Sequence, residues 1–129
     1  MLRSKLSPGT RCALEHGGVA PVIVDESANL PMAIDSILKG GFYHAGQVCV
    51  SVQRVYAHES VCEELAQQLA AKASKLVVGD QMDQATEVGP LITTGEVERV
   101  AQWVDEAVDK GGKLLTGGKA LSDLSLIHI

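Results

Sequence analysis

The chain has 129 residues, of which 46% are apolar and 21% charged, a composition that indicates a soluble globular domain. The net charge of −5 argues against a nucleic-acid partner, which would favour a basic surface. No apolar run reaches the roughly 18 residues of a membrane span. Cys12, Cys49 and Cys62 lack the spacing of a disulfide framework or a zinc site. We therefore expect no membrane partner and a reducing, cytoplasmic setting.

The first third of the chain predicts two strands followed by a helix. Residues 11–15 are expected as a short strand, which Gly17 and Gly18 interrupt. Ala20–Val24 is expected as a buried strand because three consecutive β-branched residues end it. Residues 30–38 carry apolar side chains at helical spacing, with a proline suited to the first turn.

The middle of the chain predicts a turn, a strand and a long helix. Residues 46–49 are expected at the end of the first helix or in the loop after it, and residues 50–57 as a second strand. Residues 60–76 form the clearest amphipathic helix. Ser60 is expected to cap this helix, and Glu63 completes a capping-box pattern.

The last third predicts a loop, a helix and a short strand. Residues 79–90 are expected as a loop, and residues 94–110 as a helix that Gly111 and Gly112 end. Residues 113–116 are expected as a short strand. Because strands alternate with helices and no internal repeat is visible, the chain predicts an α/β domain with a largely parallel sheet.

Two residues are candidates for chemistry. Cys49 stands three residues after Gly46, and a thiolate there could act as a nucleophile, although a small buried apolar role is the better interpretation of this segment alone. Glu15 follows an apolar segment and precedes two glycines, a placement suited to a general base acting on water, although an exposed turn residue would look the same. Gly17 and Gly18 form neither a dinucleotide fingerprint nor a Walker loop.

Two longer segments favour the catalytic interpretation of Cys49 and Glu15. Residues 14–18, followed by Ala20–Val24, resemble the glutamate signature of the aldehyde dehydrogenase superfamily, and residues 42–49 resemble its cysteine signature. Cys49 stands 34 residues after Glu15 (49 − 15), which matches the usual spacing in that family. Residues 87–92 and 111–118 resemble further family segments, so the resemblance covers roughly residues 2 to 123. It implies part of a doubly wound, Rossmann-like catalytic domain.

The resemblance implies the reaction and the role of each residue. A small-molecule aldehyde would be oxidised with NAD or NADP, through a thiohemiacetal and then a thioester on Cys49. Glu15 would activate the water that hydrolyses this thioester. Glu15, Gly17, Cys49 and Glu96 are the implied cofactor contacts, the last by gapless alignment from Cys49, and Gly18 would help to hold the glutamate segment close. No metal is implied.

The resemblance also implies a piece of a longer, homo-oligomeric enzyme, truncated at both ends and inactive alone. Residues 1–15 would end the cofactor-binding domain, and residues 16–123 would begin the catalytic domain. Residues 124–129 match the translation of a sequencing-library adapter, and we expect them to be an adapter-derived tail.

Two departures and two alternatives accompany this interpretation. His16 stands where the family more often has leucine, and Ser51 is larger and more polar than many members tolerate at that position. One alternative is a CoA-acylating relative, which generally lacks the glutamate, and the other is a non-catalytic α/β binding or structural module. The presence of both Cys49 and Glu15 favours the hydrolytic enzyme.

Overall fold

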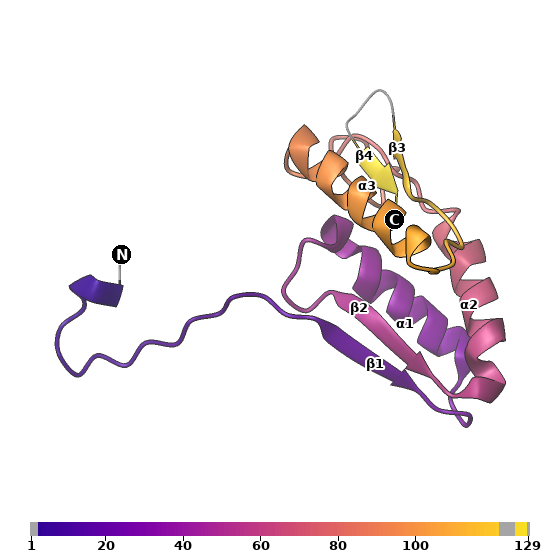
Figure 1. The fold of residues 1–129 in the computed structure, drawn as a ribbon, viewed down its shortest axis with the longest axis horizontal. Coiled ribbons are helices and arrows are strands. Elements are labelled where there is room, and N and C mark those ends of the chain that lie inside the picture. The colour runs from indigo at the N-terminus through magenta and orange to yellow at the C-terminus, as the bar shows by residue number, and fades with distance from the viewer. Residues whose placement is uncertain (1–2, 122–125, 129) are drawn as a thin grey trace.

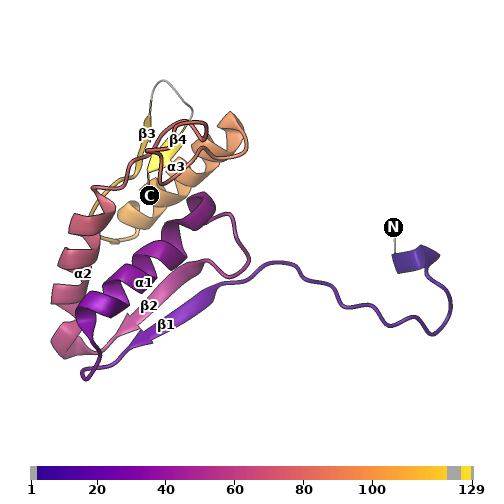
Figure 2. The same ribbon diagram turned by 180° about the vertical axis from the view of Figure 1, so that it is seen from behind.

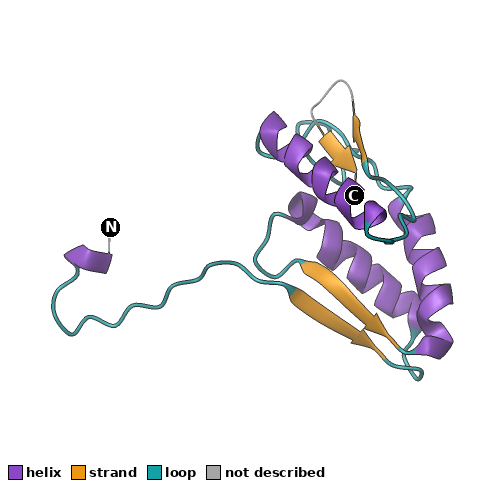
Figure 3. Ribbon diagram, in the orientation of Figure 1, coloured by secondary structure: helices purple, strands orange, loops and turns teal. Residues whose placement is uncertain are grey.

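The structure is a computed structural model that describes residues 3–121 and 126–128. Figures 1 and 3 show a long extended arm leading into a body of helices and strands. In chain order the elements are η1 (Arg3–Lys5), β1 (Ala20–Val24), α1 (Leu30–Phe42), η2 (Tyr43–Gly46), β2 (Val52–Ala57), α2 (Glu59–Ala73), α3 (Thr94–Asp109), β3 (Lys119–Leu121) and β4 (Leu126–His128).

Strands β1 and β2 form a parallel pair with α1 as the crossover between them. The register runs from Ala20 opposite Val52 to Val24 opposite Ala57, with one irregularity just after Ala20. A parallel pair needs such a crossover, and a helix is its usual form. The predicted α/β class with a parallel sheet is confirmed. The second pair, β3 with β4, is antiparallel and lies beside α3 (Figure 1).

The core lies on one face of the parallel pair. Val24 of β1, Ile34 and Ile37 of α1, and Leu65 of α2 form one buried cluster, and Ile34 is 0% exposed. The other face of the pair is open, since Ile23 is 82% exposed. The sheet is therefore covered by helices on a single side in this chain, which fits the placement of α1 and α2 in Figures 1 and 2.

The predicted strand Ala20–Val24 is confirmed to the residue, and the helix expected at 30–38 continues to Phe42. Asn29 caps α1, because its side-chain oxygen accepts a hydrogen bond from the Met32 N–H at 3.1 Å. The helix continues through Gly40 because its buried face is already anchored in the core, which outweighs the low helix propensity of glycine.

The predicted cap of α2 is wrong. The helix begins at Glu59, and the Nδ1 atom of His58 accepts from the Ser60 N–H at 3.3 Å. Because β2 runs to Ala57 and the His58 N–H donates to Val24 O at 2.9 Å, the chain must turn at His58 itself. Ser60 is thus already inside the first turn.

Two predicted strands are also wrong. Residues 11–15 lie in the extended arm and pair with no strand among the described residues (Figures 1 and 2). Residues 113–116 form no strand either, and the strand of this region, β3, starts at Lys119. A strand exists only where a partner supplies backbone hydrogen bonds, and local sequence does not reveal the partner. Helix α3 ends at Asp109, two residues before Gly111, which has φ +94°, and so within one residue of the expected end at 110.

The structure describes only part of the expected tail at 124–129. Residues 124, 125 and 129 lie outside the described residues, and Leu126–His128 form β4. The origin of these six residues stays a prediction, as do the expected domain boundaries. Within the described part of the chain, every helix is too short or too polar to cross a membrane.

Candidate functional site

The approach to Cys49 is a strained turn. One residue after the end of α1, three consecutive residues take left-handed backbone angles: His44 (φ 48°), Ala45 (φ 54°) and Gly46 (φ 73°). For a residue with a side chain this conformation costs roughly 1–2 kcal/mol. Such strain persists only where surrounding contacts impose it, and it is concentrated at functional sites. Cys49 lies in the loop that follows, as the sequence predicted.

Side-chain and backbone hydrogen bonds fix this turn on both sides of the cysteine. The Gln47 side-chain amide donates to His44 O at 3.3 Å and to Pro90 O at 3.5 Å. The Ser51 N–H donates to Val48 O at 2.9 Å and closes the turn that contains Cys49. Cys49 itself is exposed, which contradicts the interpretation of a small core residue. The structure thus presents the thiol on an anchored turn.

The predicted general base lies on the arm. Glu15 is exposed, and the backbone beside it turns at Gly17, where φ is +101°. The next residue, Gly18, touches the cysteine turn: a Cβ atom at Gly18 would lie 2.8 Å from the carbonyl oxygen of Cys49. Only glycine permits this approach without moving the backbone. The structure therefore brings the arm against the cysteine turn three residues after Glu15.

A side chain of β2 strengthens this junction. The Gln53 amide donates to Gly18 O at 3.2 Å. Since β1 and β2 are parallel, the segments that precede them reach the same edge of the sheet. Glu15 and Cys49 both precede these strands. The local sequence carried no signal for the Gln53 bond, because its partner is 35 residues away.

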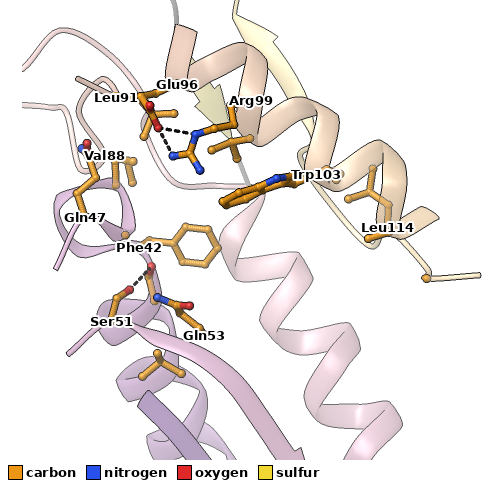
Figure 4. A pocket seen from close by; sticks show the side chains of 18 of the residues that line it. Phe42, Gln47, Ser51, Gln53, Val88, Leu91, Glu96, Arg99, Trp103 and Leu114 are labelled. Atoms are coloured by element: carbon orange, nitrogen blue, oxygen red, sulfur yellow. Dashed lines mark hydrogen bonds and ion pairs between the residues drawn. The ribbon is translucent and has the colours of Figure 1, made fainter. Parts of the chain in front are cut away.

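Glu96 occupies a different place. It lies in the first turn of α3 and accepts a hydrogen bond from Arg99 Nε at 2.9 Å, while the Arg99 guanidinium stacks 4.3 Å from the centre of the Trp103 ring (Figure 4). These three residues line a mostly apolar cavity of about 790 Å³ between α3, the end of α1 and β2. Gln47 lines the cavity too, whereas Cys49 and Glu15 do not. The cavity thus links Glu96 to the cysteine turn through Gln47.

Comparison with known proteins shows the family of this chain. Residues 2–126 match the model of the aldehyde dehydrogenase family. The chain belongs to the aldehyde dehydrogenase family. It is 45% identical to the lactaldehyde dehydrogenase of Methanocaldococcus jannaschii over 84% of its own length and 24% of that relative. It is 43% identical to the 3-sulfolactaldehyde dehydrogenase of Priestia aryabhattai over 92% of its length and 25% of that relative.

Solved aldehyde dehydrogenase structures share the fold. Glyceraldehyde-3-phosphate dehydrogenase GapN of M. jannaschii, complexed with NADP, matches with a TM-score of 0.88 and 42% identity over 98% of this chain and 27% of that one. Betaine aldehyde dehydrogenase of Staphylococcus aureus, in complex with NAD+, matches with a TM-score of 0.87 and 32% identity over 93% of this chain and 25% of that one. The chain thus has the fold of one segment of these enzymes, and spans about a quarter of their length.

Proposed function

We propose that this chain carries the nucleophile and general base of an NAD(P)-dependent aldehyde dehydrogenase that hydrolyses its acyl intermediate. The observation that supports this is the junction of two segments at one sheet edge, where Gly18 of the glutamate arm meets the Cys49 carbonyl. A nucleophile and a water-activating base must act on the same carbon in succession. This contact between the two segments supports the proposal that Cys49 and Glu15 act on the same substrate carbon.

Cys49 begins the reaction. Its sulfur attacks the carbonyl carbon of the aldehyde and forms a thiohemiacetal, whose oxygen the Cys49 backbone N–H can stabilise. The nicotinamide cofactor, when bound, supplies the oxidant that accepts a hydride from this carbon. What remains on the Cys49 sulfur is a thioester. The exposure of the thiol leaves room for a substrate to approach it.

Glu15 completes the reaction. Its carboxylate removes a proton from a water molecule, which attacks the thioester carbon, and the carbon–sulfur bond breaks to release the carboxylic acid and the Cys49 thiolate. Because the Glu15 side chain is exposed, the proton that it accepts can pass to solvent. Water rather than CoA is the proposed acceptor, since CoA-acylating relatives generally lack this glutamate.

The residues proposed to contact NAD or NADP fit such a ligand. A Cβ atom at Gly17 would meet no atom within 4 Å, so the arm leaves open space beside the glutamate for a flat ring. Glu96 supplies a carboxylate on the cavity wall that could accept hydrogen bonds from ribose hydroxyls. Glu15 and Cys49 would flank the reacting end of the cofactor.

The substrate class and assembly are proposals for the whole protein. Lactaldehyde, 3-sulfolactaldehyde and succinate-semialdehyde dehydrogenases are among the relatives. We propose a small aldehyde as substrate, a homo-oligomeric assembly and a cytoplasmic location.

A segment exchange tests the proposed chemistry. Residues 2–121 of this chain would replace the matching segment of the M. jannaschii lactaldehyde dehydrogenase, which is 45% identical. The grafted enzyme should form NADH or NADPH in an aldehyde-dependent manner, and Cys49→Ala should abolish this. Retention of activity after Cys49→Ala would contradict the proposal. A strict requirement for CoA would favour the CoA-acylating alternative instead.

The exposed cysteines provide a matched comparison in the 129-residue chain. Iodoacetamide should alkylate Cys49 faster than Cys62, which lies on the outer face of α2. Equal or slower alkylation of Cys49 would favour a structural module, because a nucleophilic cysteine has enhanced reactivity.

A further inference from the structure

Ser51 is a buried polar residue beside the candidate nucleophile. Its side chain is only 3% exposed, and it lies two residues after Cys49, just before β2. The Ser51 hydroxyl lies 3.4 Å from Gly40 O and 3.3 Å from Gly41 O. Figure 4 shows this hydroxyl pointing away from β2 toward the helix end. Its position needs an explanation, because buried polar groups are costly unless they are bonded.

The two acceptors belong to the last turn of α1. The final four carbonyls of a helix have no donor within the helix, so they depend on outside donors. Because α1 ends at Phe42, Gly40 O and Gly41 O are among these four. A serine hydroxyl has one proton, which the two carbonyls share. Ser51 therefore supplies a donor to the end of α1.

A glycine makes this contact possible. A Cβ atom at Gly40 would lie 2.9 Å from Cγ2 of Val52, a separation at which one of the two must shift. The bare glycine backbone lets the end of α1 approach the start of β2. That approach brings the carbonyls within reach of Ser51.

The backbone of the same residue holds the cysteine turn. The Ser51 N–H donates to Val48 O at 2.9 Å, and Cys49 lies inside the loop that this bond closes. One residue thus joins the end of a core helix through its side chain and the cysteine turn through its backbone. Rigid placement of a reacting group lowers the barrier of the step in which it acts.

We propose that Ser51 is a positioning residue that holds the Cys49 turn against the end of α1. An effect of Ser51 on catalysis rests on the proposed role of Cys49 as the nucleophile. The effect of Ser51 on the geometry of the turn is independent of that role. The buried hydroxyl of Ser51 thereby has a specific function in this chain.

The test measures motion at Cys49 in the 129-residue chain by backbone ¹⁵N relaxation. Ser51→Ala should lower the order parameter of the Cys49 amide from about 0.85, typical of a rigid backbone, toward about 0.6. Ser51→Thr keeps the hydroxyl and should restore it. Ser74→Ala is the matched control, because the Ser74 hydroxyl donates to Ala71 O at 3.0 Å at the end of α2, away from the cysteine turn.

Ser51→Cys covers the case in which the alanine variant does not fold, since a thiol fills similar space and is a weaker donor. An intermediate order parameter at Cys49 supports the proposal. An order parameter unchanged in both Ser51→Ala and Ser51→Cys, or lowered equally by Ser74→Ala, overturns it.

Kinetics of the grafted enzyme separate positioning from folding. Ser51→Ala should lower kcat by about 10- to 100-fold with KM nearly unchanged, because misplacement by about 1 Å has this order of effect. A rise in KM with kcat unchanged overturns the positioning role. If the graft is inactive with Ser51 in place, the proposed function fails, and the relaxation measurements still decide whether Ser51 holds the turn.

Discussion

The two segments that carry the candidate catalytic residues are held in opposite ways. The cysteine turn follows a helix whose face is buried in the core, and Gln47 and Ser51 fix it from either side. The glutamate arm is exposed from Arg3 to Val19. Close to Glu15, this arm meets the body through the Gly18 contact with Cys49 and the hydrogen bond from Gln53 to Gly18 O.

This difference shows how much of the site the chain organises by itself. A turn between two packed elements inherits their rigidity, whereas an extended arm gains order only from the groups that cover it. The turn that carries the proposed nucleophile is therefore positioned within this chain. The placement of Glu15 depends on a junction of two residues at the sheet edge.

The largest expected effect is on the chemistry of the arm. In the grafted enzyme, Glu15→Gln should lower steady-state turnover by about 10²–10⁴-fold, the usual contribution of a general base. The first turnover should still release about one equivalent of reduced cofactor, because Cys49 forms the thioester without Glu15. Rapid-mixing absorbance at 340 nm measures both phases.

Glu26→Gln is the matched control, since Glu26 is also exposed but lies at the opposite end of β1. Loss of the initial phase in Glu15→Gln would mean that Glu15 acts before the thioester forms.

The second largest effect is on stability and concerns the buried face of α1. Ile34→Ala removes a side chain that is 0% exposed, and should lower the free energy of unfolding by about 2–5 kcal/mol. Leu14→Ala, on the arm, should change it by less than about 0.5 kcal/mol, because Leu14 is 52% exposed. Urea denaturation followed by circular dichroism measures both. Equal losses would show that the arm is packed as firmly as the core.

The third largest effect concerns the contact between the glutamate arm and the cysteine turn. Gly18→Ala places a methyl group 2.8 Å from Cys49 O, and should lower the free energy of unfolding by about 1–3 kcal/mol as the backbones separate. Gly95→Ala is the control, because its methyl group would meet its nearest atom at 3.9 Å. Amide hydrogen exchange should also quicken around Gly18 in the first variant. Unchanged exchange there would mean that the arm adapts without leaving the turn.

The smallest effect tests strain in the cysteine turn. Ala45→Gly should raise the free energy of unfolding by about 0.5–1 kcal/mol, because glycine adopts the observed φ of 54° without a steric penalty. Ala33→Gly, inside α1, should lower it by about 0.5–1 kcal/mol. Thermal melts of the two variants should therefore shift in opposite directions. A loss of stability in Ala45→Gly would show that the turn is not strained at this residue.

Much of the fold follows from local patterns. The β-branched run of β1, the apolar spacing of α1 and α3, and the glycine after α3 each placed an element, because these signals act within one strand or a few helical turns. The cysteine and glutamate signatures likewise placed the candidate residues on the segments before β2 and β1.

Contacts between distant segments were not predictable in this way. The arm at 11–15 has strand-like sequence but pairs with no strand in the part of the chain that the structure describes. His58, and not Ser60, caps α2 because β2 ends beside Val24. Propensity describes what a segment can form, and the backbone hydrogen bonds of its neighbours decide what it does form.

The sequence by itself determined the family, the order of β1, α1, β2, α2 and α3, and the identity of the residues proposed for chemistry. Only the tertiary structure decided how those residues are held: Ser51 against the end of α1, Gln53 on the Gly18 carbonyl, and Gly18 on Cys49. Each of these contacts joins residues at least ten positions apart. They exist because packing of α1 on the parallel pair brings their backbones within hydrogen-bond or van der Waals distance, a condition that no local pattern encodes.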